Sequence, residues 1–237
     1  MSTKYSAVLF SGGLDSAVLL AEALASAGGD PSAGPLPLYV SAGFAWEDEE
    51  QAMAARLFSR PPFAGAVGRL VPLRFDVRDV LPETHWAVRG TPPAFDTPDE
   101  DVYLEGRNII LLSKAALYTA AAFPTRSEAA RIALLFGTLA GNPFPDATPQ
   151  FFTAMARTLS LGLAREFVVE TPFVMMRKSE VIRRGMALGV PFDLTLSCMQ
   201  PARGQHCGRC SKCRERRDAF REAGVEDPAS YRETPLR

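Results

Sequence analysis

The sequence Ser11-Gly12-Gly13-Leu14-Asp15-Ser16 stands between two apolar runs, and this arrangement decides the fold. The run before it, residues 7–10, predicts a buried strand, and the run after it, residues 17–24, predicts a helix. Two adjacent glycines allow a tight turn and a close approach of the backbone to a ligand. The serine hydroxyls and the free N–H groups of the helix start then suit a phosphate. The spacing differs from both the Walker pattern and the G-x-G-x-x-G pattern.

The bulk composition is that of a folded globular protein. The chain has 237 residues, 47% of them hydrophobic, and a formal net charge of −1. Its length is sufficient for a sizeable core, and its near-neutral charge argues against direct nucleic-acid binding. No apolar run approaches the ~20 residues of a membrane span, and the N-terminus leaves no room for a signal peptide. We therefore expect a cytoplasmic protein.

Strand and helix patterns alternate along most of the chain, which predicts an α/β fold with a doubly wound parallel sheet. A break at residues 79–101 predicts a long irregular segment, in which His85 is expected to be a surface residue. Loops are expected at residues 28–37 and 137–146. The expected strands are 7–10, 36–43, 67–75, 130–137 and 167–172, and the expected helices are 17–24, 47–58, 109–122, 151–163 and one from Lys178 to Gly189.

The four cysteines lie close together near the C-terminus, at Cys198, Cys207, Cys210 and Cys213. In a reducing compartment such a cluster predicts metal ligands rather than disulfides. Four thiolates complete the tetrahedral shell of Zn²⁺, so the site is expected to be structural. An iron–sulfur cluster is the alternative, and His206 is a possible substitute ligand. We expect residues 1–190 to form the nucleotide domain and residues 191–237 a small helical zinc-binding subdomain.

Further motifs accompany the loop and the cysteines. Gly106-Arg107-Asn108 precedes a predicted helix, Lys178-x-Glu180 begins another, and Ser197-Cys198 opens the cysteine region. Together they resemble the QueC (ExsB) family of 7-cyano-7-deazaguanine synthases, which belongs to the PP-loop N-type ATP pyrophosphatases. The resemblance runs from Ala7 to about Phe220. It implies a Rossmann-like fold of the adenine nucleotide alpha hydrolase type.

The resemblance also implies a function. Members of this family adenylate 7-carboxy-7-deazaguanine with ATP, releasing pyrophosphate, and convert it with ammonia through an amide to the nitrile. The implied cofactors are ATP, Mg²⁺ and structural Zn²⁺, and family members form homodimers. The residues that match its catalytic positions are Asp15, Lys178 and Arg107, and those expected at the nucleotide are Ser11, Gly12, Gly13, Leu14, Asp15, Ser16, Gly43, Gly106 and Asn108.

Two stretches depart from the family pattern. Residues 43–47 replace an aromatic-Gly-Gln-x-His-like string, and residues 141–148 replace the usual substrate loop. Phe144, Asp146 and Phe152 keep the frame of a substrate pocket, in which Asp146 is expected to accept hydrogen bonds from a guanine-like edge. One alternative is a QueC-like paralogue that joins a deazapurine or another carboxylate to a different amine or a protein acceptor. A nucleic-acid-binding zinc module is a further alternative, which the intact loop and neutral charge disfavour.

Overall fold

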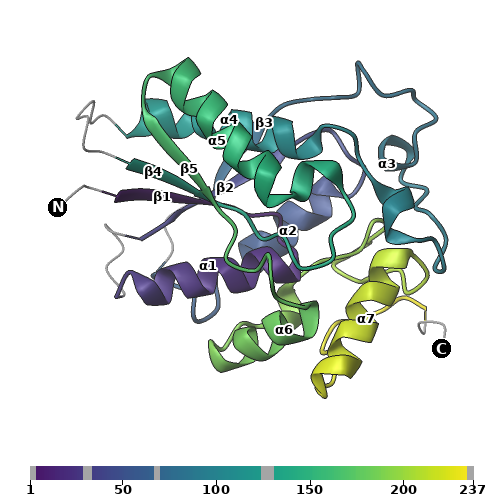
Figure 1. Cartoon of the computed structure of the whole chain (residues 1–237). Helices are drawn as coiled ribbons and strands as arrows, with labels where there is room; N and C mark the ends of the chain where they lie inside the picture. Colours follow the sequence, from purple (N-terminus) through teal and green to yellow (C-terminus); the bar gives the residue numbers. More distant parts are fainter. Residues whose placement is uncertain (1–3, 29–33, 67–69, 124–130, 234–237) are drawn as a thin grey trace.

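The computed structural model of the chain describes residues 4–28, 34–66, 70–123 and 131–233, and it contains a five-stranded parallel sheet (Figure 1). The strand order is β3-β2-β1-β4-β5, so the first strand is central. The strands are β1 (Lys4–Leu9), β2 (Leu36–Ser41), β3 (Val71–Arg74), β4 (Arg131–Leu135) and β5 (Glu166–Glu170). Chain order reverses between β1 and β4, which makes the carboxyl ends of these two strands a topological switch point.

Helices cover both faces of the sheet, as expected for a doubly wound fold (Figure 1). One face carries α1 (Leu14–Ser26), α2 (Glu47–Leu57) and α6 (Lys178–Ala187). The opposite face carries α4 (Arg107–Ala122) and α5 (Pro149–Leu163). Successive β1 residues alternate between the two apolar layers, with Val8 in the first and Ala7 in the second. Burial on both sides explains why residues 7–10 are a continuous apolar run.

Several element boundaries differ from the sequence prediction. The third strand is shorter than residues 67–75, and both α4 and α5 begin two residues earlier than expected. Pro149 occupies the first position of α5, where its missing N–H costs nothing, and Thr148 Oγ1 accepts a hydrogen bond from Phe151 N. The expected strand starts at 67 and 130, and loop residues 29–33, lie outside the described residues.

The segment after α6 contains α7 (Ser211–Ala223) and packs on the rest of the fold. The four cysteines and Phe220 belong to the same apolar cluster as Val8 and α1, and Leu196 N donates to Gly12 O at 2.8 Å. Whether the chain divides at residue 190 therefore stays a prediction.

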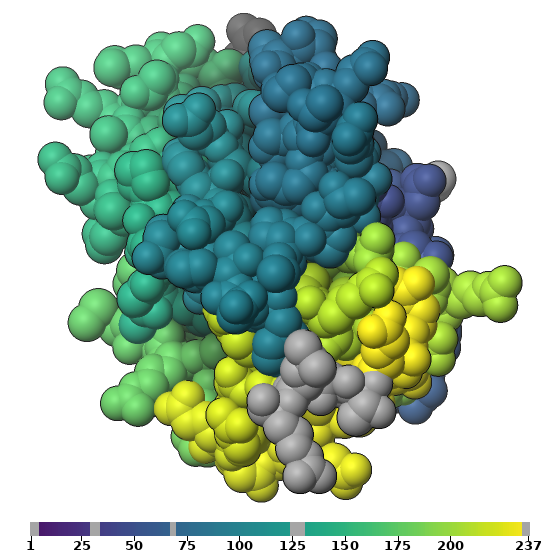
Figure 2. Space-filling view, turned by 90° about the vertical axis from the view of Figure 1, so that its right-hand side faces the viewer, coloured from purple at the N-terminus to yellow at the C-terminus, as the bar shows by residue number. Residues whose placement is uncertain are grey.

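The long segment before α4 includes α3 (Trp86–Arg89) and the short 3-10 helix η1 (Asp99–Val102); η2 (Pro145–Ala147) and η3 (Phe192–Leu194) occur later. Figure 2 shows this segment, in blue and teal, spread over one face and meeting the yellow C-terminal segment. Within the described residues, no helix combines the length and apolar character needed to cross a membrane.

Candidate active site and metal centre

A cavity of about 530 Å³ opens at the carboxyl ends of β1 and β4, where open α/β sheets bind their ligands. The loop after β1 forms one wall, and Gly137, which follows β4 closely, lies against it. A Cβ atom on Gly137 would be 3.6 Å from the Asp15 backbone. The predicted catalytic, nucleotide and substrate residues that line this cavity are Ser11, Gly13, Leu14, Asp15, Ser16, Arg107, Asn108, Phe144, Asp146 and Lys178, and the predicted metal ligand Cys198 also lines it.

The glycine loop has the form that its sequence predicts. Gly12 has φ 77°, a left-handed conformation that favours glycine, and the loop leads directly into α1 at Leu14. Ser16 Oγ donates to Gly13 O at 3.0 Å, and Gly13 N donates to Ser11 Oγ at 3.3 Å. The loop is thus held in shape by its own hydroxyls, while the first-turn N–H groups of α1 lack intrahelical acceptors. These groups can receive an anion.

Lys178 lies between two carboxylates in this wall. Its Nζ is 3.2 Å from Asp15 Oδ2 and also pairs with Glu215 of α7. Burial alone would lower the pKa of Lys178, but the two carboxylates outweigh it and the pKa is raised. The lysine is therefore a permanent cation next to the phosphate loop.

The two carboxylates that pair with Lys178 have pKa values shifted in opposite directions. Burial raises the pKa of Asp15 despite the lysine, and its Oδ1 has no hydrogen-bond partner in the described part of the chain. Burial also opposes ionisation of Glu215, but Lys178 and Lys212 outweigh it and lower the Glu215 pKa. Glu215 is a site residue that the sequence motifs did not predict. The available signal was its position two residues after Cys213, because the metal loop fixes the start of α7.

Arg107, Asn108 and Asp146 meet across the cavity from α4 and η2. Asn108 N donates to Asp146 Oδ2 at 3.1 Å, and Asn108 Nδ2 donates to Asp146 Oδ1 at 3.2 Å. Asn108 was expected to bind the nucleotide, and in the structure its backbone and side-chain amides both donate hydrogen bonds to Asp146. Burial raises the pKa of Asp146, against the hydrogen bonds from Asn108. The Arg107 guanidinium lines the cavity and has no acceptor or ion-pair partner among the described residues.

Four residues expected at the site do not line the cavity. Gly12, Gly43 and Gly106 have positive φ angles and shape the turns beside it. Phe152 is only 3% exposed and packs against Phe136 in the core between α5 and the sheet, with ring centroids 5.4 Å apart. The expectation that Phe152 contacts substrate is corrected by this position: its apolar ring belongs to the helix face that the sheet buries.

Residues near the two divergent stretches contribute aromatic walls. Phe44 stacks on Trp46 with ring centroids 5.1 Å apart, and Trp46 stacks on Trp86 at 5.7 Å. Tyr103 stacks on Phe144 at 5.1 Å. All five rings line the cavity, which gives it flat apolar surfaces suited to a purine-like ring.

His85, which was expected to be a surface residue, is partly buried and lies outside the cavity lining. Its Nδ1 accepts a hydrogen bond from Ala87 N at 3.2 Å, which caps the short helix α3. Its ring also lies against Trp86, with ring centroids 5.5 Å apart. This histidine therefore shapes the irregular segment.

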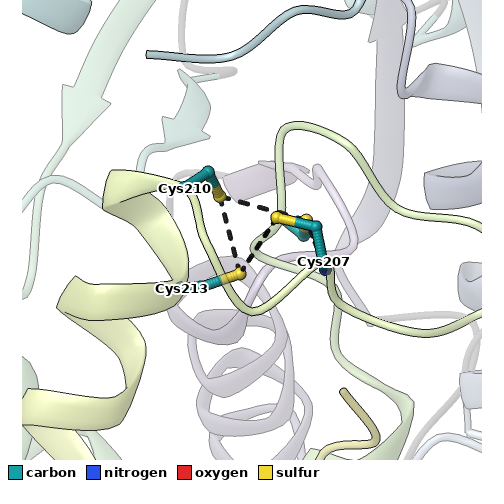
Figure 3. Close-up of side chains that lie close together, drawn as sticks. Cys207, Cys210 and Cys213 are labelled. Carbon is teal, nitrogen blue, oxygen red and sulfur yellow. Dashed lines mark hydrogen bonds between the residues drawn. The ribbon is translucent and has the colours of Figure 1, made fainter. Parts of the chain in front are cut away.

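The four cysteine sulfurs lie close together. Figure 3 shows three of them, Cys207, Cys210 and Cys213, pointing toward one another. All four are buried, and their Sγ atoms lie within 4.8 Å of one another. The closest pairs are 4.0 Å for Cys198–Cys210, 3.8 Å for Cys207–Cys213 and 3.5 Å for Cys210–Cys213. A tetrahedral ion with ~2.3 Å metal–sulfur bonds places its sulfurs about 3.8 Å apart. The geometry therefore fits one metal ion; an iron–sulfur cluster, with several atoms between its thiolates, would hold them further apart.

Backbone amides complete the surroundings of the thiolates. Gln200 N and Cys207 N donate to Cys198 Sγ at 3.3 and 3.2 Å, and Arg209 N lies 3.5 Å from Cys207 Sγ. Such bonds stabilise thiolate charge next to a metal. His206 Nε2 instead accepts from Ser197 N at 3.1 Å, so this nitrogen holds the loop rather than replacing a sulfur ligand.

A phosphate loop at the switch point, a partly buried lysine beside it and a four-cysteine centre define a class, the PP-loop nucleotide-binding α/β proteins. Residues 92–224 match the family of queuosine biosynthesis protein QueC. The chain belongs to this family.

Proteins named 7-cyano-7-deazaguanine synthase are similar to it over different spans. The protein of Methanoculleus marisnigri is 45% identical over 131 residues, 54% of this chain and 56% of its own length. Those of Geobacter sulfurreducens and Citrifermentans bemidjiense are 34% and 30% identical, cover 97% and 96% of this chain, and are themselves covered over 94% and 98% of their lengths.

Proposed function

We propose that this chain is an ATP-dependent ligase that adenylates 7-carboxy-7-deazaguanine and converts it with ammonia to 7-cyano-7-deazaguanine. The observation that carries the proposal is that the glycine loop, Lys178, Arg107 and Asp146 line one cavity. A phosphate-binding wall and a candidate purine-reading acid thus face the same space. The shared name of the curated relatives supports this substrate over other carboxylates.

The reaction needs ATP because a carboxylate has no good leaving group. Attack of a carboxylate oxygen on the α-phosphorus forms the acyl-adenylate and expels pyrophosphate. The N–H groups at the start of α1 and the Lys178 cation receive the charge that builds on the leaving phosphates. Arg107, whose guanidinium is unpaired among the described residues, is suited to the substrate carboxylate or the α-phosphate.

The remaining residues orient substrate and metal. Asp146 keeps spare lone pairs on both carboxylate oxygens and can accept N–H donors of a guanine-like ring, while Asn108 holds it in place. Asp15 Oδ1 lacks a partner among the described residues and fits a Mg²⁺ ligand, where the ion would offset phosphate charge. The four cysteines fit a structural Zn²⁺ that fixes the start of α7.

The test is a direct reconstitution. The purified protein is incubated with ATP, Mg²⁺, 7-carboxy-7-deazaguanine and ammonium. We expect AMP, pyrophosphate and the nitrile, with the amide as an intermediate that a second ATP-driven activation consumes. Pyrophosphate release with other carboxylates but not with this acid would contradict the assignment.

A further inference from the structure

The acidic side chains that line the cavity differ in their ion-pair and hydrogen-bond partners. Asp15 and Glu215 pair with Lys178, and Asp146 accepts two hydrogen bonds from Asn108. The carboxylate of Glu47 accepts from Ser41 Oγ, Ala42 N and Gly43 N, and Asp99 and Glu222 lie within 4 Å of cationic side chains. Glu50 is different: the one hydrogen bond to its carboxylate within the described residues comes from the hydroxyl of Tyr39, which donates to Oε2 at 2.7 Å.

Glu50 is a partly buried carboxylate at the cavity wall, with no cation within ion-pair distance in the described part of the chain. The charged and titratable groups that face it are Tyr39 from β2, Glu47 from its own helix and Arg107 from α4. Burial raises the pKa of Glu50 to about 8, although the Tyr39 hydrogen bond and the Arg107 charge oppose the rise. The ionised form of Glu50, which can accept a proton, is therefore the minor form at pH 7 and its fraction grows as the pH rises through about 8.

The position of Arg107 indicates that Glu50 lies near the reacting acyl group. The Arg107 guanidinium, which has no ion-pair partner in the described part of the chain and suits the substrate carboxylate, lies close enough to Glu50 to affect its ionisation. If the proposed function holds, the acyl group to be attacked is therefore near this acid. The incoming nitrogen arrives mostly as ammonium, which has no lone pair until it loses a proton.

We propose that Glu50 is the general base that takes a proton from ammonium inside the cavity, with Tyr39 as its positioning residue. An N–H bond of ammonium breaks and the proton moves to the free oxygen of Glu50. The nitrogen lone pair then forms the bond to the acyl carbon, and the electron pair of the acyl–oxygen bond leaves with AMP. The product nitrogen releases its extra proton to solvent, which leaves the neutral amide. This inference rests on the proposed function and adds the source of the nucleophile.

The experiment separates adenylation from nitrogen transfer. Adenylation is measured as exchange of labelled pyrophosphate into ATP with the acid present and ammonium absent. Nitrogen transfer is measured twice, as amide formation from ammonium and as hydroxamate formation from hydroxylamine, which is unprotonated at neutral pH. We expect Glu50→Gln to lower amide formation from ammonium about 100-fold. Exchange and hydroxamate formation should stay within about two-fold of wild type.

Two further variants sharpen the assignment. Asp48→Asn makes the same chemical change at an exposed position of α2 and should leave all three rates unchanged. Tyr39→Phe removes the hydrogen bond that stabilises ionised Glu50, so the acid limb of the ammonium-dependent rate should move to higher pH. The hydroxylamine rate should show no such movement.

The outcomes distinguish the two proposals. Acid-independent or absent exchange in the wild-type protein would mean that the proposed function fails. Normal exchange together with wild-type use of ammonium by Glu50→Gln would overturn the role of Glu50. Equal losses with ammonium and hydroxylamine would also overturn it, because they would make Glu50 a binding or structural group.

Discussion

Replacement of Arg216 by methionine should be among the most destabilising single changes in the C-terminal segment. The Arg216 side chain is 1% exposed and its Nε and Nη2 donate to Asp227 Oδ1 at 3.1 and 2.9 Å. It also donates to Phe192 O at 2.9 Å and to Thr195 O and Oγ1 at 3.2 and 2.8 Å. Methionine can fill the hydrocarbon volume but donates none of these hydrogen bonds.

The expected loss of stability follows from the Asp227 carboxylate, which stays in the folded protein without its cationic partner. Among the described residues, the Asp227 side chain, which is 11% exposed, would keep Tyr231 Oη and Ala229 N as donors. Breaking a buried ion pair by removing one partner costs about 3–5 kcal/mol, which shifts the folding equilibrium by roughly two to four powers of ten. Arg216→Met should therefore lower the free energy of unfolding by that amount.

Urea unfolding of the zinc-loaded protein, followed by tryptophan fluorescence, measures this loss. Arg221→Met is the matched control on the same helix, because Arg221 is 73% exposed and its pair with Asp218 should contribute less than about 1 kcal/mol. In a cycle with Asp227→Asn, the double variant should lose at least about 1 kcal/mol less than the sum of the single variants. A loss below about 1 kcal/mol for Arg216→Met, or additive losses in the cycle, would refute the reasoning.

The same pair predicts how stability depends on pH. Burial alone would raise the pKa of Asp227, but Arg216 outweighs it and the pKa is lowered in the folded protein. The stabilisation is therefore complete above the ordinary aspartate pKa of ~3.9 and is lost as the pH falls through the folded value. Arg216→Met should flatten this acid limb of the unfolding free energy.

Three other changes have distinct expected outcomes. Lys178→Met should abolish pyrophosphate exchange while metal content is retained, because the cation beside Asp15 is lost; exchange at the wild-type rate would exclude a role in catalysis. Cys210→Ala should lose zinc, measured by atomic absorption, and lower the melting temperature; a stable, zinc-free and inactive variant would instead make the metal catalytic. Gly185→Ala should cost about 1–3 kcal/mol in urea unfolding, because its Cβ would lie 2.5 Å from the Phe192 ring; an unchanged midpoint would show that the ring moves freely.

The features that the sequence alone determined are local ones. Apolar runs of strand and helix length predicted the parallel sheet, and two glycines followed by a helix start predicted the phosphate loop around Gly12. The spacing of the cysteines predicted their convergence, because a C-x2-C-x2-C run can turn around a single ion. In each case the residues that decide the structure are close in the chain, so their chemistry and spacing suffice.

The tertiary structure decided which distant side chains meet. Asn108 matched a nucleotide-binding position, yet the approach of η2 to α4 engages it with Asp146. Glu50 reads as a first-turn acid of a helix, and only the pairing of β2 with β1 brings it, with Tyr39, to the cavity. Glu215 reaches Lys178 because the cysteine centre fixes the start of α7 beside the loop. Burial and charge at such contacts depend on packing between elements, and the pKa and role of each group depend on those contacts.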